Sequence, residues 1–341
     1  MPQLSKLSWI VVAAAALLAP MPKAAAEDAL KVTVAHRGGW ETAAPQLGQQ
    51  AGIFKKHGIV LDLSYAEADQ DAELPVISGS AEVGVGVGVI DALRAYADKD
   101  ASLRIIGANM TGSANYWYVA ATSPIQKVKD IGGRTIAYWK GGASGQYDVF
   151  DFMDRYRLKA RPALTSGEAA AFDQVMAGKI DVGWATPPFG LDALEQDRIR
   201  VVAKANDIPK IRDKTVGVMI ASTDTLEKRG DVIGRFVQAY RETVDWMYSD
   251  PAAPKAYADF ADMPEALARL LRDEFFTKEM LSPDKVLGLS VIAKDALKAR
   301  HMRTAMSRRQ LREIVQVPLS DRAKASAKGG GWFRLLSPRS P

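Results

Sequence analysis

Two patterns of hydrophobic and polar residues alternate along the chain. Short segments with a period of two, typical of strands, are followed by segments whose apolar residues recur every three or four positions, as in amphipathic helices. This order favours a parallel sheet with helices on both faces. In the first part of the chain it predicts strands at residues 30–35, 59–65, 82–87 and 103–108, and helices at 46–57, 71–78 and 90–97.

A further strand, 117–121, ends at the break Thr122-Ser123-Pro124, and a second series follows. Two series predict an α/β protein with two sheets. The most economical arrangement places residues 27–120 and 216–300 in a first lobe and residues 121–215 in a second lobe. The second series has predicted strands at 135–138, 180–184, 199–203 and 215–221, and helices at 146–156, 169–176, 187–196 and 231–248, with a mostly helical pattern up to 299.

The N-terminus has the pattern of an export signal. Lys6 precedes an apolar run from Leu7 to Leu18, and small residues follow at Ala24-Ala25-Ala26. A charged start, an apolar run and an A-x-A site predict a signal peptide over residues 1–26, cleaved after Ala26. The run is too short to span a bilayer. We expect a freely soluble periplasmic protein, and an uncleaved anchor is the alternative.

Composition excludes several classes of site. Cysteine is absent, which rules out disulfides, thiolate nucleophiles and cysteine-based zinc sites, and the three histidines are widely separated. We expect neither metal nor cofactor. The formal net charge is +5. Much of this excess lies at 300–312, in a predicted basic extension over 301–341 whose tail from about 318 we expect to be mobile. No aromatic residues interleave that cluster, so we interpret it as a solvated face without nucleic-acid binding.

The candidate chemistry centres on a glycine-rich loop between a predicted strand and a predicted helix. The loop reads Lys140-Gly141-Gly142-Ala143-Ser144-Gly145. The first N–H groups of a helix have no intrahelical partner and carry partial positive charge, so such a loop is suited to an anion. Ser144 and the neighbouring backbone N–H groups are the first candidates. An ordinary N-cap role for Ser144 is the alternative.

Four motifs in order then carry a resemblance, namely Gly52-Ile53-Phe54-Lys55-Lys56-His57-Gly58-Ile59-Val60-Leu61, Ser78-Gly79-Ser80-Ala81-Glu82-Val83-Gly84, Val128 to Ala137, and Gly178 to Pro188. With these motifs behind an export signal, the chain resembles the solute-binding proteins of ABC importers for sulfonate, nitrate and taurine. The resemblance implies a two-lobed type II periplasmic-binding fold, each lobe a mostly parallel sheet flanked by helices, which closes on its ligand.

Carried over position by position, the resemblance implies ligand contacts at the strand ends that face the cleft. Arg37 would pair with an anion, or would be a solvated loop residue. The tryptophans would line the pocket or belong to the lobe cores. The implied contact residues are Arg37, Gly38, Trp40, Gly88, Asn115, Lys140, Gly142, Ala143, Ser144, Gly145, Trp184 and Thr186.

The implied function is capture of a small organic or inorganic anion, and an aromatic anion fits as well as a small alkanesulfonate. The implied partner of this monomer is an inner-membrane ABC permease with its ATPase. A ligand sensor that docks on a membrane receptor is one alternative. A pyrimidine-synthase-like enzyme of the same fold is another, but that enzyme carries a cysteine-rich motif and this chain has no cysteine. We therefore expect a protein that is not an enzyme.

Overall fold

The computed structural model describes residues 27–66, 72–98, 102–139 and 145–318, with 145–147 described by their backbone alone. Its first sheet contains β1 (Asp28–Val34), β2 (Ile59–Tyr65), β3 (Val83–Gly88), β4 (Leu103–Thr111) and β10 (Thr215–Ser222), in the order β2-β1-β3-β10-β4. β1 is parallel to β2 and β3. β10 is antiparallel to both its neighbours, so the sheet is mostly parallel, as predicted, with one reversed strand.

The second sheet repeats this arrangement. It comprises β5 (Tyr116–Ala120), β6 (Thr135–Tyr138), β7 (Arg161–Leu164), β8 (Gly183–Ala185) and β9 (Ile199–Lys204). β6 is parallel to β7, and β5 lies antiparallel between β8 and β9. A parallel bridge between Ile136 and Val182 joins the two groups of strands. The resulting order is β7-β6-β8-β5-β9.

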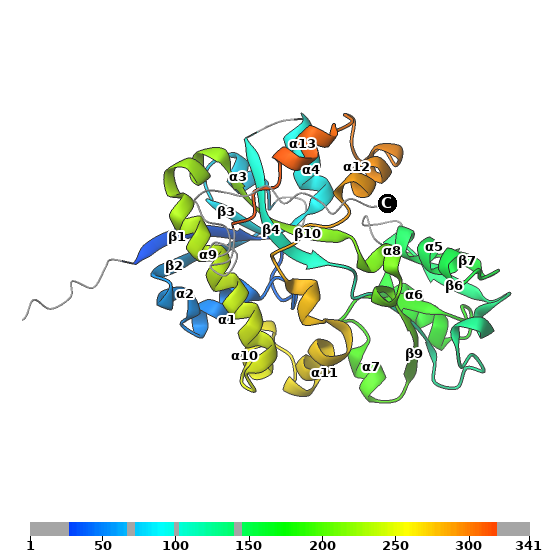
Figure 1. Cartoon of the computed structure of the whole chain (residues 1–341). Coiled ribbons are helices and arrows are strands. Elements are labelled where there is room, and N and C mark those ends of the chain that lie inside the picture. The colour runs from blue at the N-terminus through cyan, green and yellow to red at the C-terminus, as the bar shows by residue number, and fades with distance from the viewer. Residues whose placement is uncertain (1–26, 67–71, 99–101, 140–144, 319–341) are drawn as a thin grey trace, which may run out of the picture.

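The helices cover both faces of the first sheet and flank the second (Figure 1). The predicted helix 46–57 is divided at Gly52, whose φ of 73° leaves the helical region. The α-helices are α1 (Ala44–Gln50), α2 (Ile53–Lys56), α3 (Leu74–Ile77), α4 (Val89–Asp98), α5 (Gly145–Arg155), α6 (Glu168–Met176), α7 (Leu191–Glu195), α8 (Pro209–Arg212), α9 (Thr223–Ser249), α10 (Ala253–Ala261), α11 (Glu265–Phe275), α12 (Leu289–Lys298) and α13 (Arg308–Glu313).

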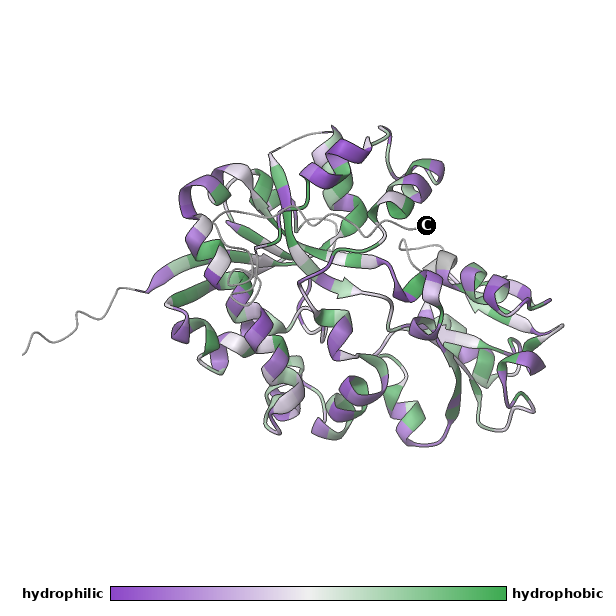
Figure 2. Ribbon diagram, viewed as in Figure 1, coloured by the Kyte–Doolittle hydropathy of each residue, from purple (hydrophilic) through white to green (hydrophobic). Residues whose placement is uncertain are grey.

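Apolar burial holds these layers together. Leu30 and Val32 of β1 pack with Phe54 and Phe236 on one face of the first sheet. The other face forms a separate cluster under α3, α4 and α12. Figure 2 shows the matching pattern, with hydrophobic strands inside and hydrophilic stretches on the surface helices. Among the described residues no helix is both long enough and apolar enough to cross a membrane.

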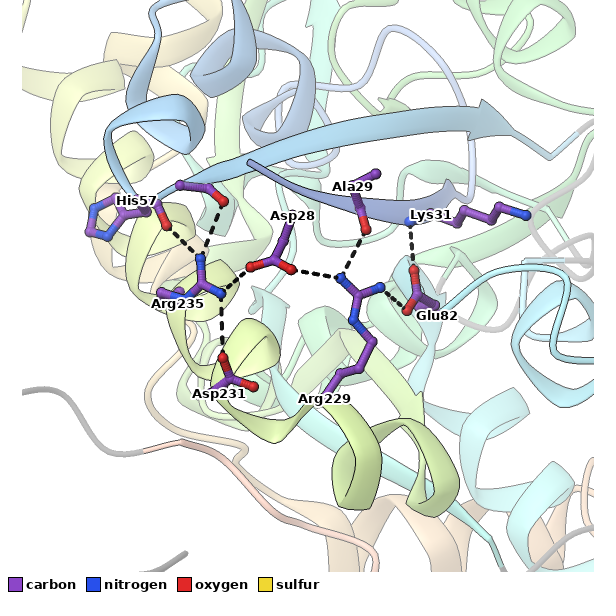
Figure 3. A network of polar contacts seen from close by, with 9 residues as sticks. Asp28, Ala29, Lys31, His57, Glu82, Arg229, Asp231 and Arg235 are labelled. Carbon is purple, nitrogen blue, oxygen red and sulfur yellow. Dashed lines mark hydrogen bonds and ion pairs between the residues drawn. The ribbon is translucent and has the colours of Figure 1, made fainter. Parts of the chain in front are cut away.

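A polar network fixes the start of β1 against α9 (Figure 3). Arg235 donates to Oδ2 of Asp28 at 2.5 Å and to the carbonyl oxygen of His57 at 2.8 Å. Arg229 pairs with Glu82 and donates to the carbonyl oxygen of Ala29. The hydrogen bond from Arg235 is the main cause that lowers the pKa of Asp28.

The C-terminal segment is partly built into the first sheet. Ile105 of β4 donates to the carbonyl oxygen of Ile314 at 2.7 Å, and Gln316 donates to the carbonyl oxygen of Ile105 at 2.8 Å. Val317 is buried as well. The predicted extension over 301–341 therefore begins as a segment that covers the edge of β4, and its tail from 319 lies outside the described residues.

One predicted boundary needs correction. The expected first lobe included residues 116–120, whereas β5 pairs with β8 and β9 in the second sheet. The first crossing between the sheets therefore lies between Thr111 and Tyr116. The chain returns to the first sheet between Lys204 and Thr215. The rest of the division into lobes stays a prediction.

Candidate functional site

The two crossings between the sheets run side by side. Gly112 donates its N–H to the carbonyl oxygen of Lys214 at 2.8 Å, and the hydroxyls of Thr111 and Thr215 are 2.9 Å apart. Gly112 has a φ of 86°, and a Cβ there would lie 2.2 Å from Oδ1 of Asn206. Glycine is the residue that allows this turn and this close approach. Paired crossings are the arrangement about which two lobes can hinge.

A polar network, buried at Ser113, Asn115 and Asp148 and exposed at Thr186, joins the first crossing to the second sheet. Ser113 Oγ and Asn115 Nδ2 donate to Oδ2 of Asp148, at 3.0 and 2.9 Å. Thr186 Oγ1 donates to Oδ1 of Asn115 at 2.7 Å, and its backbone N–H donates to Oε1 of Glu168 at 2.7 Å. Two predicted contact residues, Asn115 and Thr186, are thus brought into direct contact at the ends of different strands.

Burial changes the titration of the two carboxyl groups in this network. It raises the pKa of Asp148 to about 6, because loss of water outweighs the hydrogen bonds from Ser113 and Asn115. Burial also raises the pKa of Glu168, against the bonds from Thr186. An ionised carboxylate can only accept hydrogen bonds. A ligand group that contacts Asp148 or Glu168 in the ionised form must therefore be a hydrogen-bond donor. The sequence interpretation missed Asp148 and Glu168, since each is a single acid in the first turn of an amphipathic helix.

The proposed anion loop can be placed only in part. Gly145 is the first residue of α5, as a helix following a glycine-rich loop requires. Lys140, Gly142, Ala143 and Ser144 lie outside the described residues. Asp148, in the first turn of α5, shows that this end of the helix lies beside the crossing segment. The role of the loop in anion binding stays a prediction.

Trp184 lies inside the second sheet. Its side chain is 4% exposed, and it faces Trp117 across the β5–β8 pair. Trp117 stacks on Phe152 with ring centroids 4.1 Å apart. The indole N–H groups of both tryptophans are buried and have no hydrogen-bond acceptor among the described residues. A buried donor without a partner is costly, so these N–H groups are candidates for a ligand acceptor.

Trp40 has the packing of a core residue, the alternative that the sequence left open. Its exposure is 1%, and its ring makes edge contacts with Tyr248 and Tyr257 at 6.0 and 4.8 Å. Its Nε1 donates to the hydroxyl of Tyr248. The neighbouring Gly38, with a φ of 97°, accepts a 2.6 Å hydrogen bond from the hydroxyl of Tyr257 on its carbonyl oxygen. This contact holds the loop after β1 against α10.

Arg37 is exposed and lies beside α1, β2 and α10 of the first sheet's side of the molecule. Its guanidinium lies 5.2 Å from the ring centroid of Phe260. It opens on a cavity of about 270 Å³ that is also lined by Gln46, Gln50, Tyr65 and Asp259. None of its contacts in the described chain is with the network around Asn115.

Gly88, another predicted contact residue, ends β3 opposite Gly217. A Cβ on Gly88 would lie 2.6 Å from Oδ2 of Asp91.

Within the described ranges, no three histidine, aspartate or glutamate side chains gather as metal ligands. The acids of the network are instead held by amide, hydroxyl and backbone donors.

Two mostly parallel sheets joined by paired crossings define an α/β periplasmic-binding fold, and comparison with solved structures shows the same fold. The periplasmic aliphatic sulphonate-binding protein SsuA of Escherichia coli matches with a TM-score of 0.66 and 18% identity, over 92% of this chain and 98% of that one. A putative periplasmic sulfonate-binding SsuA from Methylobacillus flagellatus KT matches at 0.65 and 17%, over 89% and 96%. The alkanesulfonate-binding SsuA from Xanthomonas axonopodis pv. citri, bound to MOPS, matches at 0.59 and 19%, over 85% and 99%.

The sequence itself places the chain in a family. The model of the NMT1/THI5-like family matches residues 42–253, and the chain belongs to that family. No curated protein sequence gives a significant match.

Proposed function

We propose that this protein is the solute-binding component of an ABC import system. It captures a small anion of the sulfonate, nitrate or taurine type, or an aromatic organic anion, between its two sheets. It then delivers the ligand to an inner-membrane permease with its ATPase. The observation that carries the proposal is the pair of side-by-side crossings, bonded at Gly112–Lys214 and Thr111–Thr215, next to a buried polar network.

The chemistry of the site supports a ligand with both acceptor and donor atoms. The loop before α5 and the free indole N–H groups of Trp117 and Trp184 offer donors to an anionic head group. Asp148 and Glu168 offer acceptors to a hydroxyl or amino group on the same ligand. Closure over both would remove the ligand from water and strengthen each polar contact.

Binding without catalysis is part of the proposal. The contacts of two histidines are with acids and do not show a hydroxyl nucleophile beside a base: His36 lies 2.9 Å from Glu41 and His57 lies 2.9 Å from Glu242. A triad of the serine-hydrolase kind needs such a contact. A sensor that docks on a membrane receptor would use the same closure. A permease gene and an ATPase gene beside this one would favour transport.

The test is a thermal-shift screen of the mature protein, starting at Glu27, against sulfonates, aromatic carboxylates, nitrate and pyrimidines. A ligand at a hundredfold excess over its dissociation constant stabilises the folded state by about 2.7 kcal/mol. Native mass spectrometry of the protein as purified would identify a ligand that is already bound. Small-angle scattering with the hit should show a smaller radius of gyration. Binding without compaction would contradict capture by lobe closure.

A further inference from the structure

One outer end of the second sheet carries exposed cations that the proposed function does not use. Figure 1 places β6 and β7 at the end of the molecule away from the first sheet. Backbone hydrogen bonds gather this end, since Gly133 donates to the carbonyl oxygen of Lys159 at 3.0 Å and Arg161 donates to that of Arg134 at 2.8 Å. We call the cations there the basic tip, which comprises Arg134, Arg155, Arg157, Lys159 and Arg161, all exposed.

The charges of the basic tip are mostly unpaired. Within the described part of the chain, Arg134 alone of the five has an ion pair, 3.6 Å from Asp181. Asp154 is the only acid in residues 153–164, against four cations. Comparable arginines elsewhere are neutralised, for example Arg212 by Asp213 at 3.0 Å and Arg235 by Asp28 at 2.5 Å. The tip is therefore a local excess of positive charge.

Local structure accounts for only part of this cluster. Cations and proline protect an edge strand from pairing, which explains Arg161 and Pro162 in β7. The negative end of the α5 dipole favours Arg155 at its last turn. Arg157 and Lys159 lie between α5 and β7. Neither protection of an edge strand nor the helix dipole therefore explains them. Tyr156, 38% exposed, lies among them with the Arg155 guanidinium 6.0 Å from its ring.

We propose that the basic tip contacts the surface of a bilayer rich in anionic phospholipid. Lysines and arginines near such a surface are attracted to its negative potential, and tyrosine prefers the interface between water and lipid. A fluid anionic surface suits cations spread over an outer end, since it requires no groove. The proposal rests on the proposed function only for its setting, because a carrier of this kind must find a permease in a membrane.

The test measures co-sedimentation of the mature protein, from Glu27, with vesicles at low salt. One set contains phosphatidylcholine alone and the other contains phosphatidylcholine mixed with phosphatidylglycerol. We expect binding to the anionic vesicles only, and loss of binding as salt screens the charges. The variant Arg155→Gln/Arg157→Gln/Lys159→Gln/Arg161→Gln should bind on the order of a hundredfold or more weakly, since it removes four cations and each one near the surface contributes about fivefold.

The second basic cluster provides a matched control. Arg303→Gln/Arg308→Gln/Arg309→Gln/Arg312→Gln removes the same charge from exposed positions around α13 and should keep most of the binding. Equal loss in both variants would show attraction by net charge and overturn the proposal. So would wild-type binding to neutral vesicles, or no binding to anionic ones. Circular dichroism should confirm that both variants fold, and the double variant Arg155→Gln/Lys159→Gln should give an intermediate loss. No ligand is present, so this result is independent of solute capture.

Discussion

Asn115 donates a 2.9 Å hydrogen bond from Nδ2 to Oδ2 of Asp148, and this bond ties the first crossing between the sheets to the first turn of α5. Both side chains are buried. Asn115 also accepts a hydrogen bond from Thr186 at the end of β8. A single amide therefore connects the crossing, the helix that follows the glycine-rich loop, and a strand end. Any movement of the second sheet about the crossing must carry this network with it or break it.

The first prediction concerns the titration of Asp148. Its pKa rises from 3.8 to about 6 on folding, so the folded state binds the proton more tightly than the unfolded state. Stability should therefore fall as the pH rises from about 4 to about 6, by roughly 3 kcal/mol, and should then level off. Asp148→Asn removes this titration and should flatten the profile. Urea unfolding across this pH range measures it.

Asp154→Asn is the control, because Asp154 is an exposed acid of the same helix. It should leave the wild-type profile unchanged. A wild-type slope retained in Asp148→Asn would show that another group causes it.

The second prediction concerns the crossing itself. Gly112→Ala places a Cβ 2.2 Å from Oδ1 of Asn206, at a φ of 86°. We expect a loss of more than about 1–2 kcal/mol in stability, the usual cost of a side chain in the left-handed region, with a weaker compaction on ligand binding. Gly133→Ala has a similar φ of 75° but no atom within 4 Å of its Cβ. Gly133→Ala should therefore lose only the stability that the left-handed backbone conformation costs. Equal losses of stability in both variants would show that the Cβ at residue 112 does not crowd Asn206.

The α/β class and most strands could be predicted from the sequence because apolar periodicity reports burial directly. Two features could not. β7 has the sequence Arg161-Pro162-Ala163-Leu164, which neither alternates nor forms an apolar run, since this edge strand is mostly exposed. The antiparallel insertion of β10 between β3 and β4 depends on where the chain returns from the second sheet. No local pattern encodes that choice.

The candidate site shows the same division. Asn115 and Thr186 could be selected because both stand at strand ends, and their side chains are in contact. Their contact with a ligand stays a prediction. Asp148 could not be singled out, because its importance arises from burial against Ser113 and Asn115, which are more than thirty positions away. For Trp40 the sequence left pocket wall and lobe core open, and the two tyrosines of later helices that pack against its ring could not be foreseen from its place after β1.

The third prediction concerns acid stability at the start of β1. Arg235 holds the pKa of Asp28 below 3.8, so the pair contributes stability above that pH and loses it as the pH falls through the folded pKa. Asp28→Asn should lower the melting temperature at neutral pH, and its difference from wild type should vanish in acid. Asp62→Asn, an exposed acid on β2, is the control and should match wild type throughout. A difference that persists in acid would mean that packing, and not charge, is responsible.

The fourth prediction tests the glycine-rich loop with the ligand found in the thermal-shift screen. Ser144→Ala should weaken binding moderately, by about 0.5–1.5 kcal/mol for a neutral partner and up to about 3 kcal/mol for a charged one. Gly142→Val should weaken it more, because a branched side chain blocks close approach of the backbone. Calorimetry measures both, with circular dichroism to confirm folding. Wild-type affinity in Gly142→Val would move the anion site away from this loop.

The last prediction concerns the indole donors. Trp184→Phe removes a buried N–H that has no acceptor in the described structure, so the free protein loses no hydrogen bond and should remain folded. If that N–H meets a charged ligand oxygen, the variant should bind about 1.5–3 kcal/mol more weakly, on the order of tenfold to a hundredfold. Trp117→Phe is the matched comparison, since Trp117 faces Trp184 but stacks on Phe152. Titration calorimetry on both variants separates the roles. A larger loss in Trp117→Phe would assign the ligand donor to that residue, and unchanged affinity in both would leave the two tryptophans as core.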